Sequence, residues 1–273
     1  MERARINTQA SNTFIAPDFV QPQPFQIFPA ERFPSINPVW WLNSHFAVGG
    51  WSPLRKLSGM LTAHMTQIAP RAGFTWHPHS NLEIYTWMLE GTLSHEDTTG
   101  GKGDIGPGEL QRMFSGDYIE HQELNRSDSK ARVIQIWFVA DAQYQGLKPH
   151  YQQLSQAQLP VQPPAQHSNG ATTHHLIGGG SPMDSHVKAR LTATTVQPGG
   201  IAKIAPPHMG ESLFLYVTDG QGQARHMSQT GALTGSLNQY DVILAGSDAA
   251  EAEIASQGDQ PLQFMSFYLP AFL

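Results

Sequence analysis

Two short motifs place histidine and glutamate where a metal ion could be bound. His77 and His79 are separated by one proline, and His121 and Glu123 are likewise one residue apart. In a β-strand, residues i and i+2 point to the same face. If both motifs lie on strands that line one interior, three imidazoles and one carboxylate converge. The spacing therefore predicts a mononuclear site for a divalent metal ion, with His77, His79, His121 and Glu123 as ligands.

This ligand set suits catalysis better than a structural role. Three neutral nitrogens and one carboxylate leave a net charge of about +1 on a divalent ion, and octahedral geometry then leaves two positions open. A structural site would not leave those positions vacant. We expect them to admit a substrate or dioxygen.

Other interpretations of the same residue types stay open. Histidine pairs near turns are common, so His77 and His79 alone are weak evidence, and the HxE motif is what favours a metal. Glu83 is a fifth candidate, as a ligand, as a hydrogen-bond partner for an imidazole, or as a solvated strand residue, and we favour the hydrogen-bond partner. Four histidines are expected in ordinary core, surface or loop positions: His64, His95, and the loop pair His174 and His175. Four large apolar residues are expected mainly in the core: Trp76, Trp87, Met88 and Trp137.

The rest of the chain has the pattern of strands. From Leu61 onward, short segments rich in Val, Ile, Thr and aromatic residues are separated by Gly, Pro, Asn and Asp, and long stretches of helical period are absent. This pattern predicts an all-β sandwich or barrel. The clearest strands are 61–68, 82–89, 109–113, 132–139, 187–196, 212–217, 241–244 and 262–269. Residues 151–158 are expected to form one short helix.

Proline-rich stretches suggest how the chain is divided. Residues before about 35 are polar and rich in proline, which favours an arm lying on the surface. The segment LPVQPPAQHSNG (159–170) has the composition of an interdomain linker. We predict an arm (1–38), an N-terminal barrel with the metal site (39–150), a linker (151–172) and a C-terminal barrel (173–273).

A weak internal repeat relates the two halves. YTWMLEGTLS (85–94) resembles FLYVTDGQGQ (214–223), and GELQRMFSGDYIEHQE (108–123) resembles NQYDVILAGSDAAEAE (238–253). At an offset of about 130 residues, the four candidate ligands fall on Pro206, His208, Glu251 and Glu253. A duplication would then have kept the strands and lost the histidine set. The alternative is chance similarity between short strands with glycine turns.

Composition excludes several classes of function. The excess of acidic over basic residues is six (22 minus 16), with no block of like charge, which argues against nucleic acid and a polybasic membrane patch. The absence of cysteine excludes disulfides, thiolate ligands and a cysteine nucleophile, and fits a reducing compartment. No stretch approaches the ~18 apolar residues of a membrane helix. We expect a soluble, cytoplasmic, monomeric protein.

Taken together, the motifs resemble the pirin family of bicupins. The similarity rests on HPHSNLEIYTWMLEGTLSHEDTTG (77–100), GPGELQRMFSGDYIEHQE (106–123) and QIWFVADAQYQGLKPHYQQ (135–153). It extends more loosely to WLNSHFAVGGW (41–51) and through the second half. The resemblance implies two cupin barrels (double-stranded β-helices, or jelly rolls) packed face to face, with a metal only in the N-terminal one. It also implies the same four ligands. Tyr118 and Ser80 depart from the family pattern beside the predicted site, which puts any inherited substrate preference in doubt.

The family resemblance implies an oxidoreductase. The reaction that the resemblance implies is the cleavage of a small aromatic flavonol, such as quercetin, by dioxygen with loss of carbon monoxide. Glu123 would be a metal ligand and also the base that takes the substrate hydroxyl proton. Fe²⁺ is the expected ion, although Mn²⁺, Ni²⁺, Cu²⁺ and Zn²⁺ suit the same ligands. The alternative is a metal- or redox-sensing regulator that binds a protein partner without catalysis. A third candidate is another small-molecule reaction, since fold alone does not fix chemistry.

Overall fold

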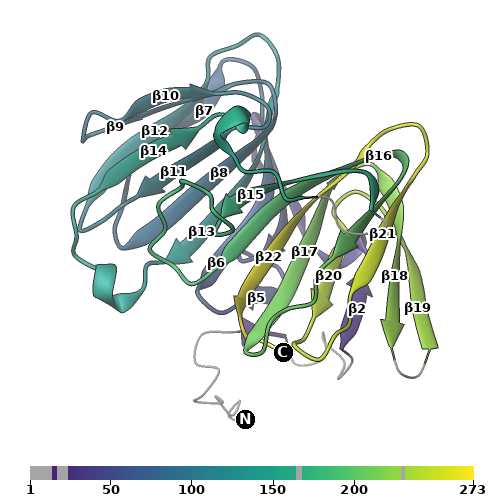
Figure 1. Cartoon of the computed structure of the whole chain (residues 1–273). Coiled ribbons are helices and arrows are strands. Elements are labelled where there is room, and N and C mark those ends of the chain that lie inside the picture. The colour runs from purple at the N-terminus through teal and green to yellow at the C-terminus, as the bar shows by residue number, and fades with distance from the viewer. Residues whose placement is uncertain (1–13, 17–23, 164–167, 229–230) are drawn as a thin grey trace, which may run out of the picture.

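The chain folds almost entirely into β-strands. The computed structural model describes residues 14–16, 24–163, 168–228 and 231–273. Its strands form two lobes that lie side by side (Figure 1). Helical structure in these ranges consists of three 3-10 turns, η1 (Ala30–Arg32), η2 (Ala142–Tyr144) and η3 (Gln156–Gln158). None of the described segments is a helix with the length and hydrophobicity needed to cross a bilayer. The predicted all-β fold is confirmed.

The N-terminal barrel is built from two facing sheets. The larger sheet has the order β14-β11-β8-β13-β6-β4-β3, and the smaller has the order β10-β9-β12-β7. Residues of both sheets, among them Met88, Val133, Leu93 and Ile105, share one buried apolar cluster. The strands are β3 (Ser35–Val39), β4 (Leu42–Val48), β6 (Met60–Ile68), β7 (Ala72–His79), β8 (Leu82–Glu90), β9 (Leu93–Asp97), β10 (Lys102–Ile105), β11 (Leu110–Phe114), β12 (Ile119–Asn125), β13 (Ala131–Val139) and β14 (His150–Leu154). Two short strands, β1 (Phe14–Ile15) and β5 (Leu54–Lys56), pair separately.

The C-terminal barrel is one sheet that folds back on itself. Its order is β19-β18-β21-β16-β22-β17-β20-β2, with β15 also paired to β16. The long β16 pairs with β22 along its first half and with β21 along its second, so one strand serves both walls. The strands are β2 (Phe25–Phe28), β15 (Asn169–Ile177), β16 (Arg190–Ile204), β17 (Glu211–Asp219), β18 (Gln221–Ser228), β19 (Gly231–Leu237), β20 (Val242–Ala245), β21 (Ala252–Gln257) and β22 (Leu262–Pro270).

The two barrels share a strand order. The run β11-β8-β13-β6 in the N-terminal sheet corresponds to β20-β17-β22-β16 in the C-terminal sheet. Strands β8 and β17 therefore occupy equivalent places, and so do β11 and β20. These are the strands of the two pairs of similar segments found in the sequence, so the weak sequence repeat coincides with a structural repeat.

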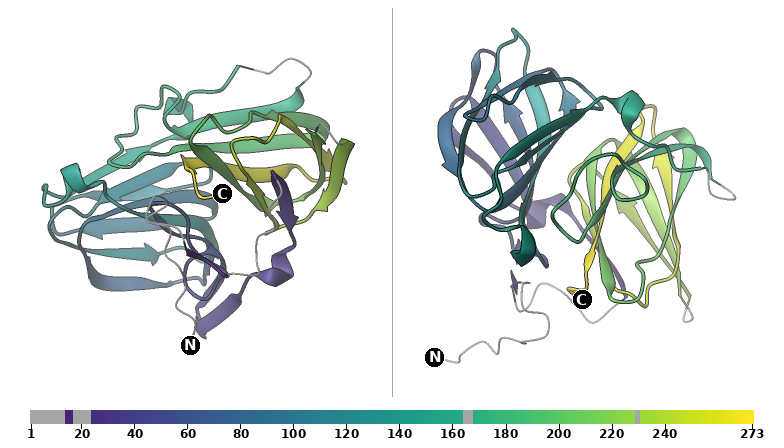
Figure 2. Two further views of the ribbon diagram at one scale, coloured as in Figure 1. Left: turned by 90° about the horizontal axis from the view of Figure 1, so that it is seen from below. Right: turned by 60° about the vertical axis from the view of Figure 1, so that its left-hand side comes forward.

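The N-terminal segment crosses to the C-terminal barrel. Strand β2 pairs antiparallel with β20, with Phe25 opposite Ala245, and so holds the place that β14 holds beside β11. Strand β2, drawn in purple, lies against the green strands of the C-terminal barrel (Figures 1 and 2). Phe25 and Phe28 are buried. The predicted surface arm is therefore wrong for this strand, because its aromatic residues enter apolar cores although prolines surround it.

The largest apolar cluster lies between the two barrels. It joins Met65 and Tyr85 of the N-terminal sheet to Phe214 and Phe267 of the C-terminal sheet. A hydrogen bond between Tyr216 Oη and His45 Nδ1 (2.8 Å) crosses the same interface. The barrels thus pack face to face over a shared core.

Two local predictions are wrong. Residues 151–158 are not a helix, because β14 pairs with β11 and a 3-10 turn follows. His174 and His175 lie on β15 and pair with Ala193 and Thr192, rather than in a loop. In both cases the segment pairs with a neighbouring strand, and these tertiary hydrogen bonds outweigh the local preference of the sequence. Both ends of the predicted linker 151–172 therefore belong to sheets, and 164–167 lie outside the described residues.

Candidate metal centre

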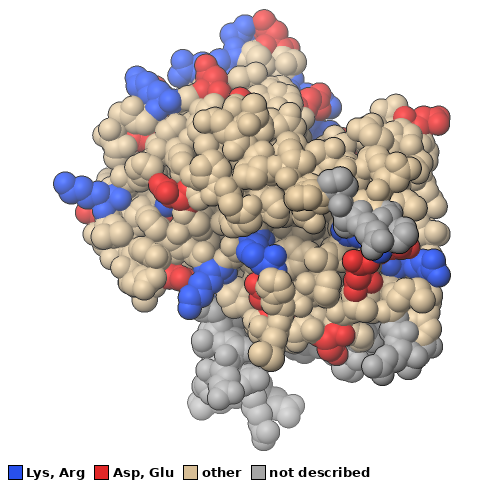
Figure 3. Space-filling model, viewed as in Figure 1, with Lys and Arg blue, Asp and Glu red and all other residues tan. Residues whose placement is uncertain are grey.

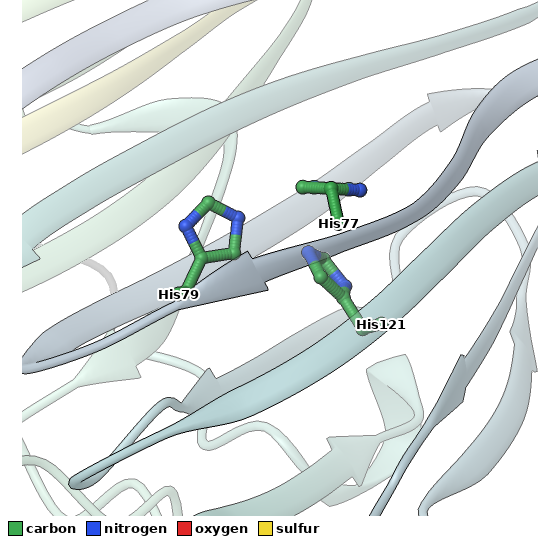
Figure 4. A group of neighbouring side chains, drawn as sticks. All are labelled: His77, His79 and His121. Atoms are coloured by element: carbon green, nitrogen blue, oxygen red, sulfur yellow. The ribbon is translucent and has the colours of Figure 1, made fainter.

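Two neighbouring strands of the smaller sheet carry the candidate histidines. Strands β7 and β12 pair antiparallel, with His121 opposite His77 and Ile119 opposite His79. Figure 4 shows the three imidazoles gathered together, two from one strand and one from its neighbour. Their ligating atoms lie within 4.8 Å of one another. The structure therefore brings three of the four predicted ligands into one group.

A bulge in β7 helps to orient these rings. Between Phe74 and His77, the residues Thr75 and Trp76 lie opposite the single residue Gln122 of β12. Such a bulge bends a strand and redirects its side chains. The carbonyl of Thr75 accepts a hydrogen bond from His77 Nδ1 at 2.7 Å. Because a carbonyl only accepts, His77 Nδ1 carries a proton, which leaves Nε2 as the ring nitrogen that could bind a metal ion.

Two ring nitrogens in the group have no protein partner. His79 Nε2 and His121 Nε2 are buried and make no hydrogen bond within the described residues. Burial, reinforced by the neighbouring histidines, lowers the pKa of His121 to about 2 and that of His79 to about 4. Both rings are therefore neutral at pH 7. Buried ring nitrogens without a partner are costly unless a ligand satisfies them, so these residues fit a divalent metal ion.

Glu123 is buried in a second group that overlaps the first. The ligating atoms of His95, His121 and Glu123 lie within 4.8 Å of one another, so His121 is common to both groups. The sequence predicted that Glu123 would join His77 and His79 directly. The structure instead places it on the His95 side of His121.

Three side chains of the larger sheet hold the Glu123 carboxylate. Gln135 Nε2 donates to Oε2 at 2.6 Å, while Gln111 Nε2 and Thr86 Oγ1 donate to Oε1 at 3.0 and 3.4 Å. The donors lie on register-paired positions of β11, β8 and β13, so they form one row across the wall facing β12. This row holds the carboxylate through three neutral donors.

A buried chain of side chains runs from His121 along β9. His121 Nδ1 lies 3.4 Å from His95 Nδ1, and His95 Nε2 lies 3.0 Å from Asp97 Oδ2. The side chains of His95 and Asp97 are fully buried. Burial raises the pKa of Asp97, but hydrogen bonds from His95, Thr99 and Gly101 outweigh it and hold the pKa at about 2. Asp97 is therefore a carboxylate at pH 7.

Glu83 faces away from this site. Thr86 of β8 points into the N-terminal barrel, so Glu83, of opposite parity, points toward the other barrel. Its fully buried carboxylate pairs with Arg112 through Nε (2.7 Å) and Nη2 (3.0 Å), and it accepts bonds from Tyr85 Oη (2.8 Å) and the His186 amide (2.9 Å). The expectation that Glu83 supports a ligand imidazole is wrong.

One aromatic side chain contacts a candidate ligand, and two others that lie near candidate ligands in sequence are exposed. His77 and His79 are half-buried, and the ring of Trp137 meets the ring of His79 edge-on with centroids 5.1 Å apart. Trp76 is 46% exposed and Tyr118 is 55% exposed. The expected core role of Trp76 is therefore wrong, whereas Trp87 and Met88 are buried.

Sequence reasoning missed several polar residues of this site. His95 was expected in an ordinary position, and Asp97, Gln111 and Gln135 were not considered. Two signals were available. His95 and Asp97 have the same i, i+2 spacing as the histidine motifs, and Gln135 interrupts an apolar strand between two isoleucines. A polar side chain in a strand buried on both faces needs a partner.

The same region matches a known family. Residues 54–138 match the family model Pirin. Residues 54–138 form a pirin domain. This pirin domain contains both groups of candidate ligands, and the resemblance to pirins expected from the sequence is confirmed.

Relatives with assigned names match parts of the chain. A Mycobacterium tuberculosis protein named "Putative quercetin 2,3-dioxygenase" is 39% identical over 124 residues, 44% of this chain and 50% of the relative. A Zymomonas mobilis protein with the same description is 48% identical over 73 residues, 27% of this chain and 31% of the relative. A pirin-like protein of Solanum lycopersicum is 28% identical over 177 residues, 63% of this chain and 59% of the relative. The chain spans about half the length of the first of these relatives.

Solved structures share the fold across almost the whole chain. YhhW of Escherichia coli has a TM-score of 0.71 and 21% identity, covering 90% of this chain and 97% of that one. A bacterial pirin YhhW structure in complex with nickel(II) has a TM-score of 0.71 and 22% identity, covering 90% and 99%. Quercetin 2,3-dioxygenase of Acinetobacter baumannii has a TM-score of 0.72 and 20% identity, covering 91% and 79%. The fold is therefore that of the bicupins.

Proposed function

We propose that this protein binds one divalent metal ion at His77, His79, His121 and Glu123 and uses it to cleave a flavonol such as quercetin with dioxygen. The observation that carries the proposal is the pair of buried, unpartnered nitrogens, His79 Nε2 and His121 Nε2, beside His77. Its support from comparison is that the mycobacterial and Zymomonas relatives carry the name "Putative quercetin 2,3-dioxygenase".

Glu123 has the capacity to complete the ligand set. Its Oε2 accepts the bond from Gln135, and a carboxylate oxygen has room for a second interaction. Glu123 and the histidine group have His121 in common, since His121 belongs to both groups of candidate ligands. The same residue is the candidate base for the flavonol hydroxyl proton.

The ion and Trp137 have separate roles in this proposal. When bound, the ion would supply a Lewis acid for the substrate hydroxyl and a redox partner for dioxygen. Trp137, edge-on to His79, offers an apolar surface for a flat ring beside the ligands. We infer Fe²⁺ as the ion in this chain, while nickel(II) is the ion named for the YhhW complex.

The test is aerobic turnover of quercetin by metal-loaded protein. Loss of the flavonol absorbance is followed for wild type, for His79→Ala, and for His175→Ala as a matched control from the other barrel. We expect turnover by wild type and the control and none by His79→Ala. Absence of turnover with Fe, Mn, Ni, Co and Cu would exclude quercetin as substrate. The regulator alternative would then predict a protein partner whose capture depends on the metal and its oxidation state.

A further inference from the structure

Asp97 and His95 form an oriented pair behind the ligand His121. Both lie on β9, which pairs with β12, so that Asp97 is opposite His121 and His95 is opposite Glu123. Tyr151 stacks on the His95 ring with centroids 4.5 Å apart and an interplanar angle of 15°. The imidazole is thus fixed in its plane by an aromatic ring and at one edge by a carboxylate.

The orientation of Asp97 is set by the turn after β9. Its Oδ1 accepts three hydrogen bonds, from Thr99 N (2.8 Å), Thr99 Oγ1 (2.6 Å) and Gly101 N (3.0 Å). Its Oδ2 faces His95 Nε2 at 3.0 Å. Because a carboxylate oxygen only accepts, Nε2 must be the protonated nitrogen of His95.

This protonation has a consequence for His121. If His95 carries one proton, placed on Nε2 by Asp97, its Nδ1 is an acceptor, and His121 Nδ1 lies 3.4 Å from that atom. The donor in this long contact is then His121 Nδ1, which leaves His121 Nε2 with the lone pair. His121 Nε2 is the buried atom without a protein partner.

We propose that Asp97 and His95 are positioning residues that fix the tautomer of His121, so that His121 binds metal through Nε2. The inference rests on the metal binding proposed above and is independent of the substrate. Neither residue is a ligand in this arrangement. Each acts through the hydrogen bond that it makes to the next ring, as outer partners of metal-binding histidines commonly do.

Asp97→Asn reverses the chain of hydrogen bonds. The three donors of the turn require a carbonyl oxygen at the Oδ1 position, so the new amide NH₂ must occupy the Oδ2 position. It would donate to His95 Nε2, move the His95 proton to Nδ1, and make His121 Nδ1 the acceptor. His121 Nε2 would then be protonated, and metal binding there would first require that proton to move to the other nitrogen, which weakens binding.

The experiment uses the full chain and Zn²⁺ alone, which is redox-silent. Competition with a chromophoric chelator gives the Kd, and long-range ¹H–¹⁵N spectra of metal-free, histidine-labelled protein show which ring nitrogens are protonated. We expect Asp97→Asn to bind Zn²⁺ about 10–100-fold more weakly. In its spectra the ring proton should lie on Nδ1 of His95 and on Nε2 of His121. Glu96→Gln is the matched control, since Glu96 lies between the two residues on β9 and pairs with Lys102 at 2.6 Å. It should bind as wild type does.

Results from the variant or from wild type could overturn the proposal. Folded Asp97→Asn protein would do so if its Zn²⁺ affinity or its tautomers matched those of wild type. Wild type would do so if metal-free His121 carried its proton on Nε2, or if zinc bound through His121 Nδ1 in the group with His95 and Glu123. Failure of wild type to bind Zn²⁺ would instead refute the metal function, while the metal-free spectra would still decide the tautomer.

Discussion

Gln135 Nε2 and Glu123 Oε2 lie 2.6 Å apart and join the two sheets of the N-terminal barrel. Gln135 belongs to the larger sheet and Glu123 to the smaller one, so this bond bridges the walls at the candidate site. Gln135 is one of three neutral side chains that donate to the buried Glu123 carboxylate.

Gln135→Leu should therefore destabilise the protein by about 1–3 kcal/mol, because a buried charged acceptor loses a donor. Urea unfolding of the metal-free protein measures the change. Gln122→Leu is the control, since Gln122 is the neighbour of Glu123 and donates to Glu96 instead, in a part-buried hydrogen bond. Equal losses in both variants would show that the bond to Glu123 has no special role.

Removal of the metal should lower thermal stability in a ligand-dependent way. A ligand at one hundred times its Kd adds about 2.7 kcal/mol to the free energy of unfolding. A chelator should thus lower the Tm of wild type but not that of His79→Ala or His121→Ala. Elemental analysis should find one metal per chain. Two per chain would contradict the prediction that the C-terminal barrel is empty.

The Glu83–Arg112 pair should behave as an interface element rather than a site element. Replacing either residue alone leaves a buried charge uncompensated, which typically costs about 3–5 kcal/mol. The double variant Glu83→Met, Arg112→Met should cost less than either single variant, as urea unfolding would show. Zn²⁺ affinity should not change, because Glu83 faces away from the histidines. A loss of affinity would place Glu83 back in the metal site.

His64 should make stability fall as the pH falls below 6.5. Burial against Phe46 and the rest of the barrel lowers its pKa from 6.5 to about 4, so the unfolded chain takes up a proton before the folded one. The contribution of His64 to the free energy of unfolding is fully present above pH 6.5 and is lost progressively toward pH 4. The loss amounts to about 3 kcal/mol. His64→Gln should flatten this part of the profile measured on metal-free protein. Identical slopes in both proteins would contradict it.

Strand parity explains how much of the site was predictable. It requires only local alternation, and it correctly anticipated that His77, His79 and His121 meet. The expectation for Glu83 failed because Asn81, with φ of 55°, lies in the turn between β7 and β8, and a turn resets which face each residue occupies. The β7 bulge, which no sequence signal marks, places Glu123 opposite Phe74.

Non-local pairing accounts for what could not be predicted. The role of His95 and Asp97 depends on β9 lying beside β12, and the donors to Glu123 come from three strands of the opposite sheet. Composition also misled the prediction for Phe25–Phe28, since the prolines around this strand say nothing of the edge of β20 that accepts it.

The pairing of β2 with β20 has a consequence in time. During synthesis Phe25–Phe28 leaves the ribosome more than two hundred residues before Val242–Ala245, while the N-terminal barrel closes with β14, a strand near it in sequence. Strand β2 can therefore meet β20 only after more than two hundred further residues have been made. The C-terminal barrel is thus closed by a segment made before the N-terminal barrel, so its completion is a long-range step in folding.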